Sequence, residues 1–164
     1  MKIVHVAPGH VELGSAGVEL RTLLGSCVAI SLWQPLRKIG ALSHVALPAR
    51  NLPPGGRGLD GRFADEAWVK MSMLLAAHGI SPNECVCKIF GGGRIFANEF
   101  ANVGSRNIES VRQLLHSCGV AISKEHVGGI GHREVRFNLA TGDVWMRHRP
   151  TQLTHGTDFK ETIE

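Results

Sequence analysis

Short strand-like segments separated by tight turns fill the first third of the chain, and this pattern restricts its fold more than any other feature. Apolar residues alternate in part over residues 20–24 and 28–33, with Gly25-Ser26 between the two segments. Residues 39–47 form the next candidate strand, and Pro35 marks the turn before it. The N-terminal third is therefore predicted to be β-structure.

Two amphipathic helices and further strands are predicted downstream. Apolar residues at helical spacing predict a helix over residues 63–78, which Gly79 ends. A second helix is expected to begin with Ser105 as its N-cap and to end at Gly119. Strands are expected over residues 85–90 and 120–127, with a hairpin formed by residues 135–139 and 144–148. Two main helices against a β-rich core predict an α+β fold, a single-domain α/β sandwich.

The length of 164 residues suits one domain with a hydrophobic core. We expect this domain to span residues 1–149 and a polar tail to follow over residues 150–164. No apolar run reaches the ~18 residues needed to cross a bilayer, so no membrane insertion is expected. The first residues resemble a strand rather than a signal peptide, which predicts a cytoplasmic protein.

The charge of the chain gives little support to nucleic-acid binding. The formal net charge is +4, but the Lys and Arg residues are scattered along the sequence rather than clustered. Aromatic residues make up 5% of the chain and tyrosine is absent, which leaves few platforms for base stacking. No nucleic-acid partner is expected, and an acidic protein surface suits this charge equally well.

Cys27 is the candidate nucleophile, because it follows a Gly-Ser turn and His44 lies on a nearby predicted strand. A free thiol has a pKa of about 8.5, and a neighbouring imidazolium can lower it to roughly 3.5–7.5. If the two strands are neighbours, His44 could act first as base and then as acid. The structural alternatives are a buried cysteine that acts as a small hydrophobe and a hydrogen-bonded core histidine.

The residues around Cys27 supply the other parts that such a site needs. Gly25 permits a tight turn that leaves backbone N–H groups free to form an oxyanion hole. Either Thr22 or Ser26 could orient the imidazole, although both hydroxyls also suit a plain turn or strand. The histidines show no metal-ligand spacing, and Gly91-Gly92-Gly93 lacks the residues that complete a phosphate loop. Neither a metal nor a cofactor is predicted.

An ordered set of motifs along the chain resembles the CheD family of chemoreceptor glutamine deamidases. The resemblance runs from the N-terminus to about Arg149. Its motifs lie, in order, at residues 22–29, 40–48, 88–93, 103–107, 128–133, 135–137 and 141–142. This ordered set is far more specific than any one of its members.

The resemblance implies a Cys-His-Thr triad that deamidates glutamines on methyl-accepting chemoreceptors. The family's cysteine corresponds to Cys27 and its histidine to His44. In some members the threonine lies one position upstream, where this chain has Arg21, so Thr22 is the nearest candidate. The implied fold is an α/β sandwich related to other cysteine-dependent deamidases. Gly25 and Ser26 would support the oxyanion, and chemoreceptor helices would be the substrate.

Other functions remain open at this point. The same fold could serve as a non-catalytic regulatory module that binds a CheC-type phosphatase, a partner that the resemblance also implies. A receptor methylesterase would use a similar Cys-His pair. Residues 48–62 form a loop rich in glycine and proline, and we expect it to contribute to the receptor-binding surface.

Overall fold

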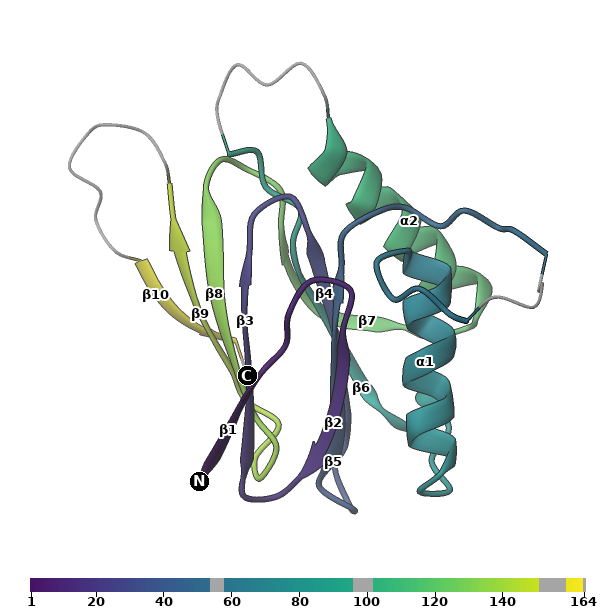
Figure 1. The fold of residues 1–164 in the computed structure, drawn as a ribbon. Coiled ribbons are helices and arrows are strands. Elements are labelled where there is room, and N and C mark those ends of the chain that lie inside the picture. Colours follow the sequence, from purple (N-terminus) through teal and green to yellow (C-terminus); the bar gives the residue numbers. More distant parts are fainter. Residues whose placement is uncertain (54–57, 96–101, 151–158, 164) are drawn as a thin grey trace.

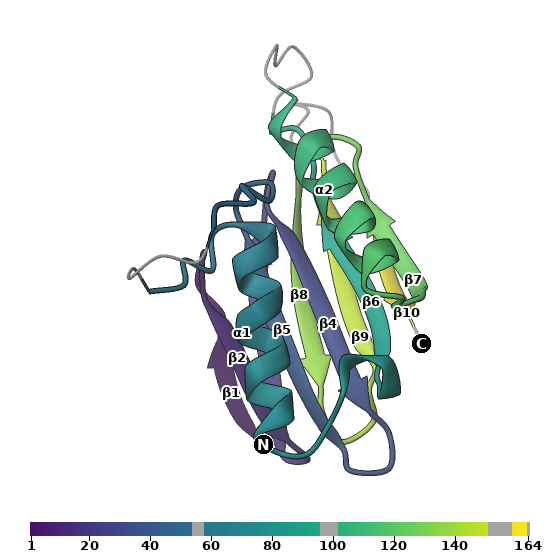
Figure 2. The same cartoon turned by 90° about the vertical axis from the view of Figure 1, so that its right-hand side faces the viewer.

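Two five-stranded β-sheets pack face to face, and two helices cover the outer face of one of them (Figures 1 and 2). The computed structural model describes residues 1–53, 58–95, 102–150 and 159–163. The first sheet has the strand order β1-β3-β8-β9-β10. Its strands are β1 (Lys2–His5), β3 (Val18–Leu24), β8 (His132–Asn138), β9 (Val144–Arg149) and β10 (Phe159–Ile163).

The second sheet has the order β2-β5-β4-β6-β7 and carries the helices. Its strands are β2 (Val11–Ser15), β5 (Ile39–Val45), β4 (Val28–Gln34), β6 (Val86–Gly91) and β7 (Ile122–Val127). The helices are α1 (Ala64–Ala76) and α2 (Val103–Ser117), and a single 3₁₀ turn spans Pro82–Glu84. The molecule is thus a three-layer sandwich in which the second sheet is the middle layer.

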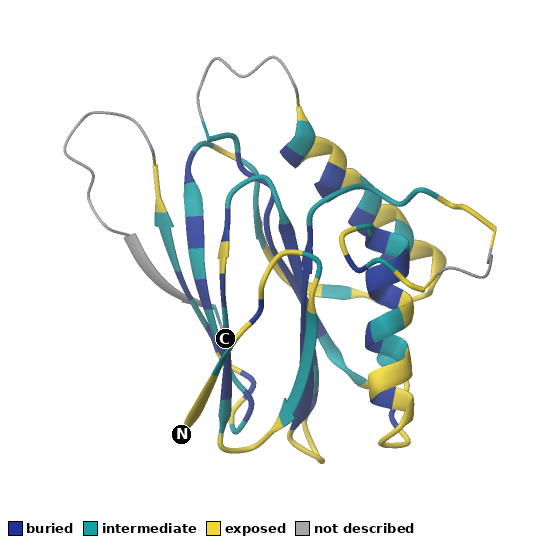
Figure 3. Ribbon diagram, viewed as in Figure 1, coloured by how far each residue is buried: buried dark blue, intermediate teal, exposed yellow. Residues whose placement is uncertain are grey.

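Side chains alternate along the strands between two apolar cores, one on each face of the middle sheet (Figure 3). On β4, Val28 and Ile30 face the helices, whereas Ala29 faces the other sheet. Strand β8 belongs to the first sheet, and its buried residues alternate with half-buried ones, because only one face of that sheet packs against the middle sheet. The middle sheet is covered on both faces, which explains why β4 and β5 are buried along almost their whole length.

The predicted α+β sandwich is confirmed, and so are both helices and the strands of the first third. The second helix begins three residues earlier than expected, with Asn102 as its N-cap and Val103 as its first residue. Ser105 is not the N-cap, because it already lies in the first turn of the helix. Its hydroxyl donates a hydrogen bond to Oδ1 of Asn102, the residue in the cap position. Strands β2 and β10 were not anticipated, and both are edge strands.

The C-terminal region contributes a strand to the first sheet. Strand β10 pairs antiparallel with β9, and Ile163 packs against the core between the sheets. Part of the expected tail over residues 150–164 is therefore sheet, while residues 151–158 and 164 lie outside the described residues. A boundary of the catalytic domain at residue 149 remains a prediction.

Candidate active site

Cys27 lies at the entrance to β4, on the face of the middle sheet that is turned toward the other sheet. The ladder between β4 and β5 places Ala29 opposite His44. Because side chains alternate along a strand, Cys27 lies on the same face as Ala29, and it packs against the same inner core. Cys27 and His44 are therefore diagonal neighbours across the ladder, a separation of about 7–8 Å that long side chains can bridge.

His44 is held from the opposite sheet by Thr22. The Thr22 hydroxyl lies 2.7 Å from Nδ1 of His44, and both residues are buried. Thr22 lies on β3 of the first sheet, so this hydrogen bond crosses the interface between the sheets. Of the two hydroxyls considered from the sequence, Thr22 is thus the one that bonds His44; the described hydrogen bonds include none between Ser26 and His44.

Arg21 lies on the opposite face of β3 from Thr22. Its guanidinium forms an ion pair with Glu19, and its strand neighbour on β8 is Arg136. This outward face carries charged side chains, whereas Thr22 is directed at the core between the sheets. Of positions 21 and 22, it is therefore Thr22 that faces His44.

The backbone carbonyl of Val6 determines which imidazole nitrogen carries the proton. Its oxygen accepts a hydrogen bond from the Thr22 hydroxyl at 2.7 Å and lies 3.2 Å from Nδ1 of His44. A carbonyl can only accept, and the Thr22 proton is directed at it, so Nδ1 of His44 carries the hydrogen. The lone pair is then on Nε2, the nitrogen that a general base would use. Val6 has no polar side chain, so no sequence pattern could have identified it.

Burial holds both members of the pair in their neutral forms. Desolvation raises the pKa of the Cys27 thiol above its ordinary value. Desolvation also lowers the pKa of His44, and the hydrogen bond to the Val6 carbonyl opposes this only in part. The described hydrogen bonds include none between Cys27 and His44. The free site therefore favours a thiol beside a neutral imidazole, rather than a resting thiolate beside an imidazolium.

A glycine-rich segment at the end of β6, residues 91–93, packs against the Cys27 loop and forms backbone hydrogen bonds with it. The N–H of Gly92 donates to the Cys27 carbonyl at 2.8 Å, and the N–H of Gly93 donates to the Gly25 carbonyl at 2.9 Å. A Cβ at Gly91 would lie 2.2 Å from the Cys27 carbonyl oxygen. At Gly25 itself φ is not positive; a side chain there would meet the Ile95 side chain at 2.6 Å. Gly91 is therefore needed for close backbone approach, whereas at Gly25 a Cβ would meet only the end of a side chain.

Helix α2 reaches the same loop through Asn107. Its side-chain Nδ2 donates to the carbonyls of Ser26 at 3.0 Å and of Ala46 at 3.1 Å. These carbonyls lie one residue before Cys27 and two residues after His44. Sequence reasoning noted residue 107 only within a family motif, because the contact depends on how α2 packs on the middle sheet.

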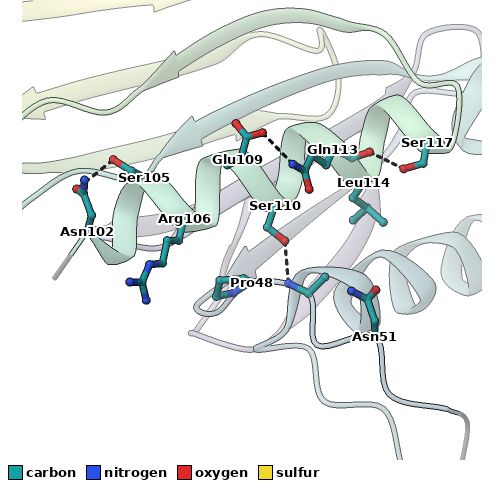
Figure 4. Close-up of a pocket in the computed structure, with 11 residues that line it drawn as sticks. Pro48, Asn51, Asn102, Ser105, Arg106, Glu109, Ser110, Gln113, Leu114 and Ser117 are labelled. Atoms are coloured by element: carbon teal, nitrogen blue, oxygen red, sulfur yellow. Dashed lines mark hydrogen bonds between the residues drawn. The ribbon is translucent and has the colours of Figure 1, made fainter.

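A groove beside the site runs between α2 and the segment that follows β5 (Figure 4). It has a volume of about 780 Å³ and a lining of mixed polar and apolar character, which does not include Cys27, His44 or Thr22. Its lining includes Pro48 and Ala49 on one side and Ser105, Arg106 and Ser110 of α2 on the other. The Ala49 N–H donates to the Ser110 hydroxyl at 2.8 Å, which ties the segment to the helix.

The loop over residues 48–62 is fixed to α1 more firmly than its composition suggests. Arg50 forms two hydrogen bonds with Glu66 and stacks on the Phe63 ring. Arg62 is paired with Asp60. These two cations are paired with carboxylates of the chain, so they offer little net positive charge to an acidic receptor surface. Residues 54–57 lie outside the described residues.

The part of the chain that the structure describes has no group of three His, Cys, Asp or Glu side chains that could hold a metal ion. No helix within those residues is long and apolar enough to cross a membrane.

Comparison with known proteins identifies relatives over most of the chain. Residues 46–148 match the family described as "CheD chemotactic sensory transduction". A relative in Albidiferax ferrireducens, named probable chemoreceptor glutamine deamidase CheD 2, is 41% identical over 87% of this chain and 84% of its own. The chemoreceptor glutamine deamidase CheD of Thermotoga maritima is 34% identical over 84% of this chain and 86% of its own. The chain therefore belongs to the CheD family.

Proposed function

We propose that this protein hydrolyses the side-chain amide of glutamine residues on chemoreceptors, with Cys27 as the nucleophile. The observation that carries the proposal is the hydrogen bond between Nδ1 of His44 and the Thr22 hydroxyl, which fixes an imidazole base on the same face of the sheet as the thiol. The names of the relatives, chemoreceptor glutamine deamidases, supply the substrate class. Adaptation of the chemotaxis response is the setting that we propose for this activity.

The first half of the reaction transfers the glutamyl group to the enzyme. Nε2 of His44 takes the proton from the Cys27 thiol as Sγ attacks the carboxamide carbon. The negative charge that develops on the amide oxygen is stabilised by the backbone N–H groups of Ser26 and Cys27. No described backbone carbonyl accepts a hydrogen bond from these two groups, so they are available to the substrate. The imidazolium then gives its proton to the departing nitrogen, so ammonia leaves and a thioester remains.

The second half of the reaction releases glutamate. His44 takes a proton from water, the hydroxide adds to the thioester carbon, and Sγ leaves with the proton that His44 returns. Thr22 and the Val6 carbonyl keep Nδ1 protonated throughout, so Nε2 remains the nitrogen that moves the proton. No cofactor takes part in this scheme.

The groove in Figure 4 is the surface that suits the receptor segment on either side of the glutamine. Pro48 follows β5, the strand that carries His44, and Ser105 and Arg106 precede Asn107, which contacts the nucleophile loop. The mixed polar and apolar lining fits the exposed surface of a helix, which presents both kinds of side chain. A CheC-type phosphatase partner and a cytoplasmic location stay predictions.

The test is the intact mass of a chemoreceptor cytoplasmic fragment incubated with wild type, Cys27→Ala and Thr22→Val. Wild type should add about one dalton per modified site, Cys27→Ala should add nothing, and Thr22→Val should act more slowly. The Thr22→Val change keeps the side-chain shape and removes the hydroxyl, so we expect a roughly 10–100-fold lower rate.

Other masses would identify the alternatives. A loss of about fourteen daltons from a methylated fragment would indicate a methylesterase. An unchanged mass with wild type, together with binding to a CheC-type phosphatase, would indicate the regulatory module. Full activity in Cys27→Ala would overturn the assignment of the nucleophile.

A further inference from the structure

Asn107 ties together the two segments that carry the reacting side chains. It lies in the second turn of α2 and is fully buried. One nitrogen, Nδ2, lies within hydrogen-bond distance of the Ser26 and Ala46 carbonyl oxygens. Because both neighbours can only accept hydrogen bonds, the amide must present its nitrogen to them, which fixes its orientation.

The other end of the same amide has no partner. Oδ1 of Asn107 is buried and accepts no hydrogen bond in the described structure. A buried acceptor without a partner is destabilising, and native structures contain few of them. Packing alone would favour an apolar side chain at this position. The contribution of Asn107 therefore lies in what its nitrogen does to the two carbonyls.

The Ser26 carbonyl controls the direction of the Cys27 N–H. The two groups belong to one peptide unit, which is planar and trans, so they point in opposite directions. A carbonyl held against α2 directs the Cys27 N–H away from the helix, and no described residue accepts a hydrogen bond from it. The next peptide unit is fixed as well, because Gly92 donates to the Cys27 carbonyl.

We propose that Asn107 is a positioning residue that orients the backbone N–H of Cys27 as an oxyanion donor. The inference rests on the proposed deamidase activity and deepens it. Among the described residues, no other side chain forms a hydrogen bond with the Ser26 carbonyl that would hold this peptide unit in place. The N–H would then be free to rotate away from the oxygen on which charge develops.

Two reactions of the same thiol separate this role from a structural one. Deamidation passes through an oxyanion, whereas alkylation of Cys27 by iodoacetamide displaces iodide at carbon and forms none. Loss of one oxyanion donor lowers kcat by about 100–1,000-fold in other enzymes. We expect Asn107→Ala to lower kcat for deamidation of a receptor fragment by about 100-fold, with KM within about threefold. Alkylation of Cys27 should stay within about threefold of wild type.

The control is Ser31→Ala. Ser31 lies on β4, the strand that follows Cys27, and its buried hydroxyl donates a hydrogen bond to the Lys88 carbonyl. This substitution should leave both rates unchanged. Each protein is assayed well below its own melting midpoint. If Asn107→Ala shows no cooperative unfolding, Asn107→Leu replaces it, because leucine has the same branching as asparagine, fills the space and has no donor.

The outcomes distinguish this inference from the proposed function. Equal losses in alkylation and deamidation would show that Asn107 only maintains the fold around Cys27, and would overturn the inference. An unchanged kcat in a folded variant would overturn it too. If wild type itself does not deamidate the fragment, the proposed function fails first, and Asn107 has no oxyanion to position.

Discussion

Burial of the Cys27 and His44 side chains favours one way of activating the proposed nucleophile over another. Desolvation raises the pKa of the thiol and lowers the pKa of the imidazole, so both groups are neutral near pH 7. A preformed thiolate–imidazolium pair would need the opposite shifts. The thiol must then lose its proton as it attacks, which makes the position of Nε2 of His44 decisive for the rate.

This protonation state predicts the pH dependence of Cys27 alkylation. The rate should rise with pH through a midpoint above that of a free thiol, because only the thiolate reacts and burial raises the pKa of Cys27 above its ordinary value. For deamidation, kcat/KM should fall on the acid side only below pH 6.5, since the pKa of His44 is lowered from 6.5 and its neutral form is the base. The measurement is the iodoacetamide rate of Cys27 from pH 5 to 10, with Cys27→Ala as the blank. A plateau of high reactivity between pH 5 and 7 would instead show a resting ion pair.

At the scale of elements, close backbone approach holds the nucleophile loop on the end of β6. Gly91 has φ +105° and a Cβ there would lie 2.2 Å from the Cys27 carbonyl oxygen. The Gly92 carbonyl in turn lies 2.4 Å from where a Cβ of Gly104 in α2 would be. The Cys27 loop, the end of β6 and α2 therefore pack backbone against backbone, with no side chain between them. This packing holds Cys27 close to both the middle sheet and α2.

Gly91→Ala should therefore displace the Cys27 loop. Gly119→Ala is the matched control, because its φ is also positive, at +70°, but a Cβ there meets nothing within 4 Å. The control should lose about 1–2 kcal/mol of unfolding free energy from backbone strain alone. Gly91→Ala should lose about 1–3 kcal/mol more from the clash, and its deamidation rate should fall beyond what unfolding explains. Urea denaturation and kcat measure the two effects; equal behaviour of the variants would contradict the close-approach argument.

Elements with a strong periodic pattern could be predicted from the sequence, whereas contacts between elements could not. The strands that carry Thr22 and His44 were identified because their apolar residues face a core. Strand β2 was missed because an edge strand has a weaker pattern, here half-exposed along most of its length. The roles of the Val6 carbonyl and of Asn107 depend on how distant segments pack, which no local pattern records.

On the scale of the whole molecule, the candidate site lies where two sheets and a helix meet. The middle sheet carries Cys27 and His44, the first sheet supplies Thr22, and α2 supplies Asn107. The outer face of the first sheet is charged and forms pairs such as Arg136 with Glu134. The α+β architecture could be predicted from the order of the elements, but the division of the strands between two sheets could not, because neighbours in the chain such as β2 and β3 belong to different sheets.

The distance of β10 from the site predicts how far the catalytic unit extends. Strand β10 pairs with β9, and β8 and β9 separate it from β3, which carries Thr22. Removing residues 150–164 takes away this edge strand, the packing of Ile163, and the hydrogen bond from Lys88 Nζ to the Ile163 carbonyl. These losses amount to about 2 kcal/mol.

The shortened chain of residues 1–149 should therefore fold and remain active. Its melting midpoint should fall by roughly 4–8 °C, and kcat should stay within about twofold of the full chain at a temperature where both are folded. Circular dichroism on heating and the receptor-fragment mass assay measure the two quantities. A folded but inactive shortened chain would show that the C-terminal region supports the site, and would move the boundary of the catalytic domain beyond residue 149.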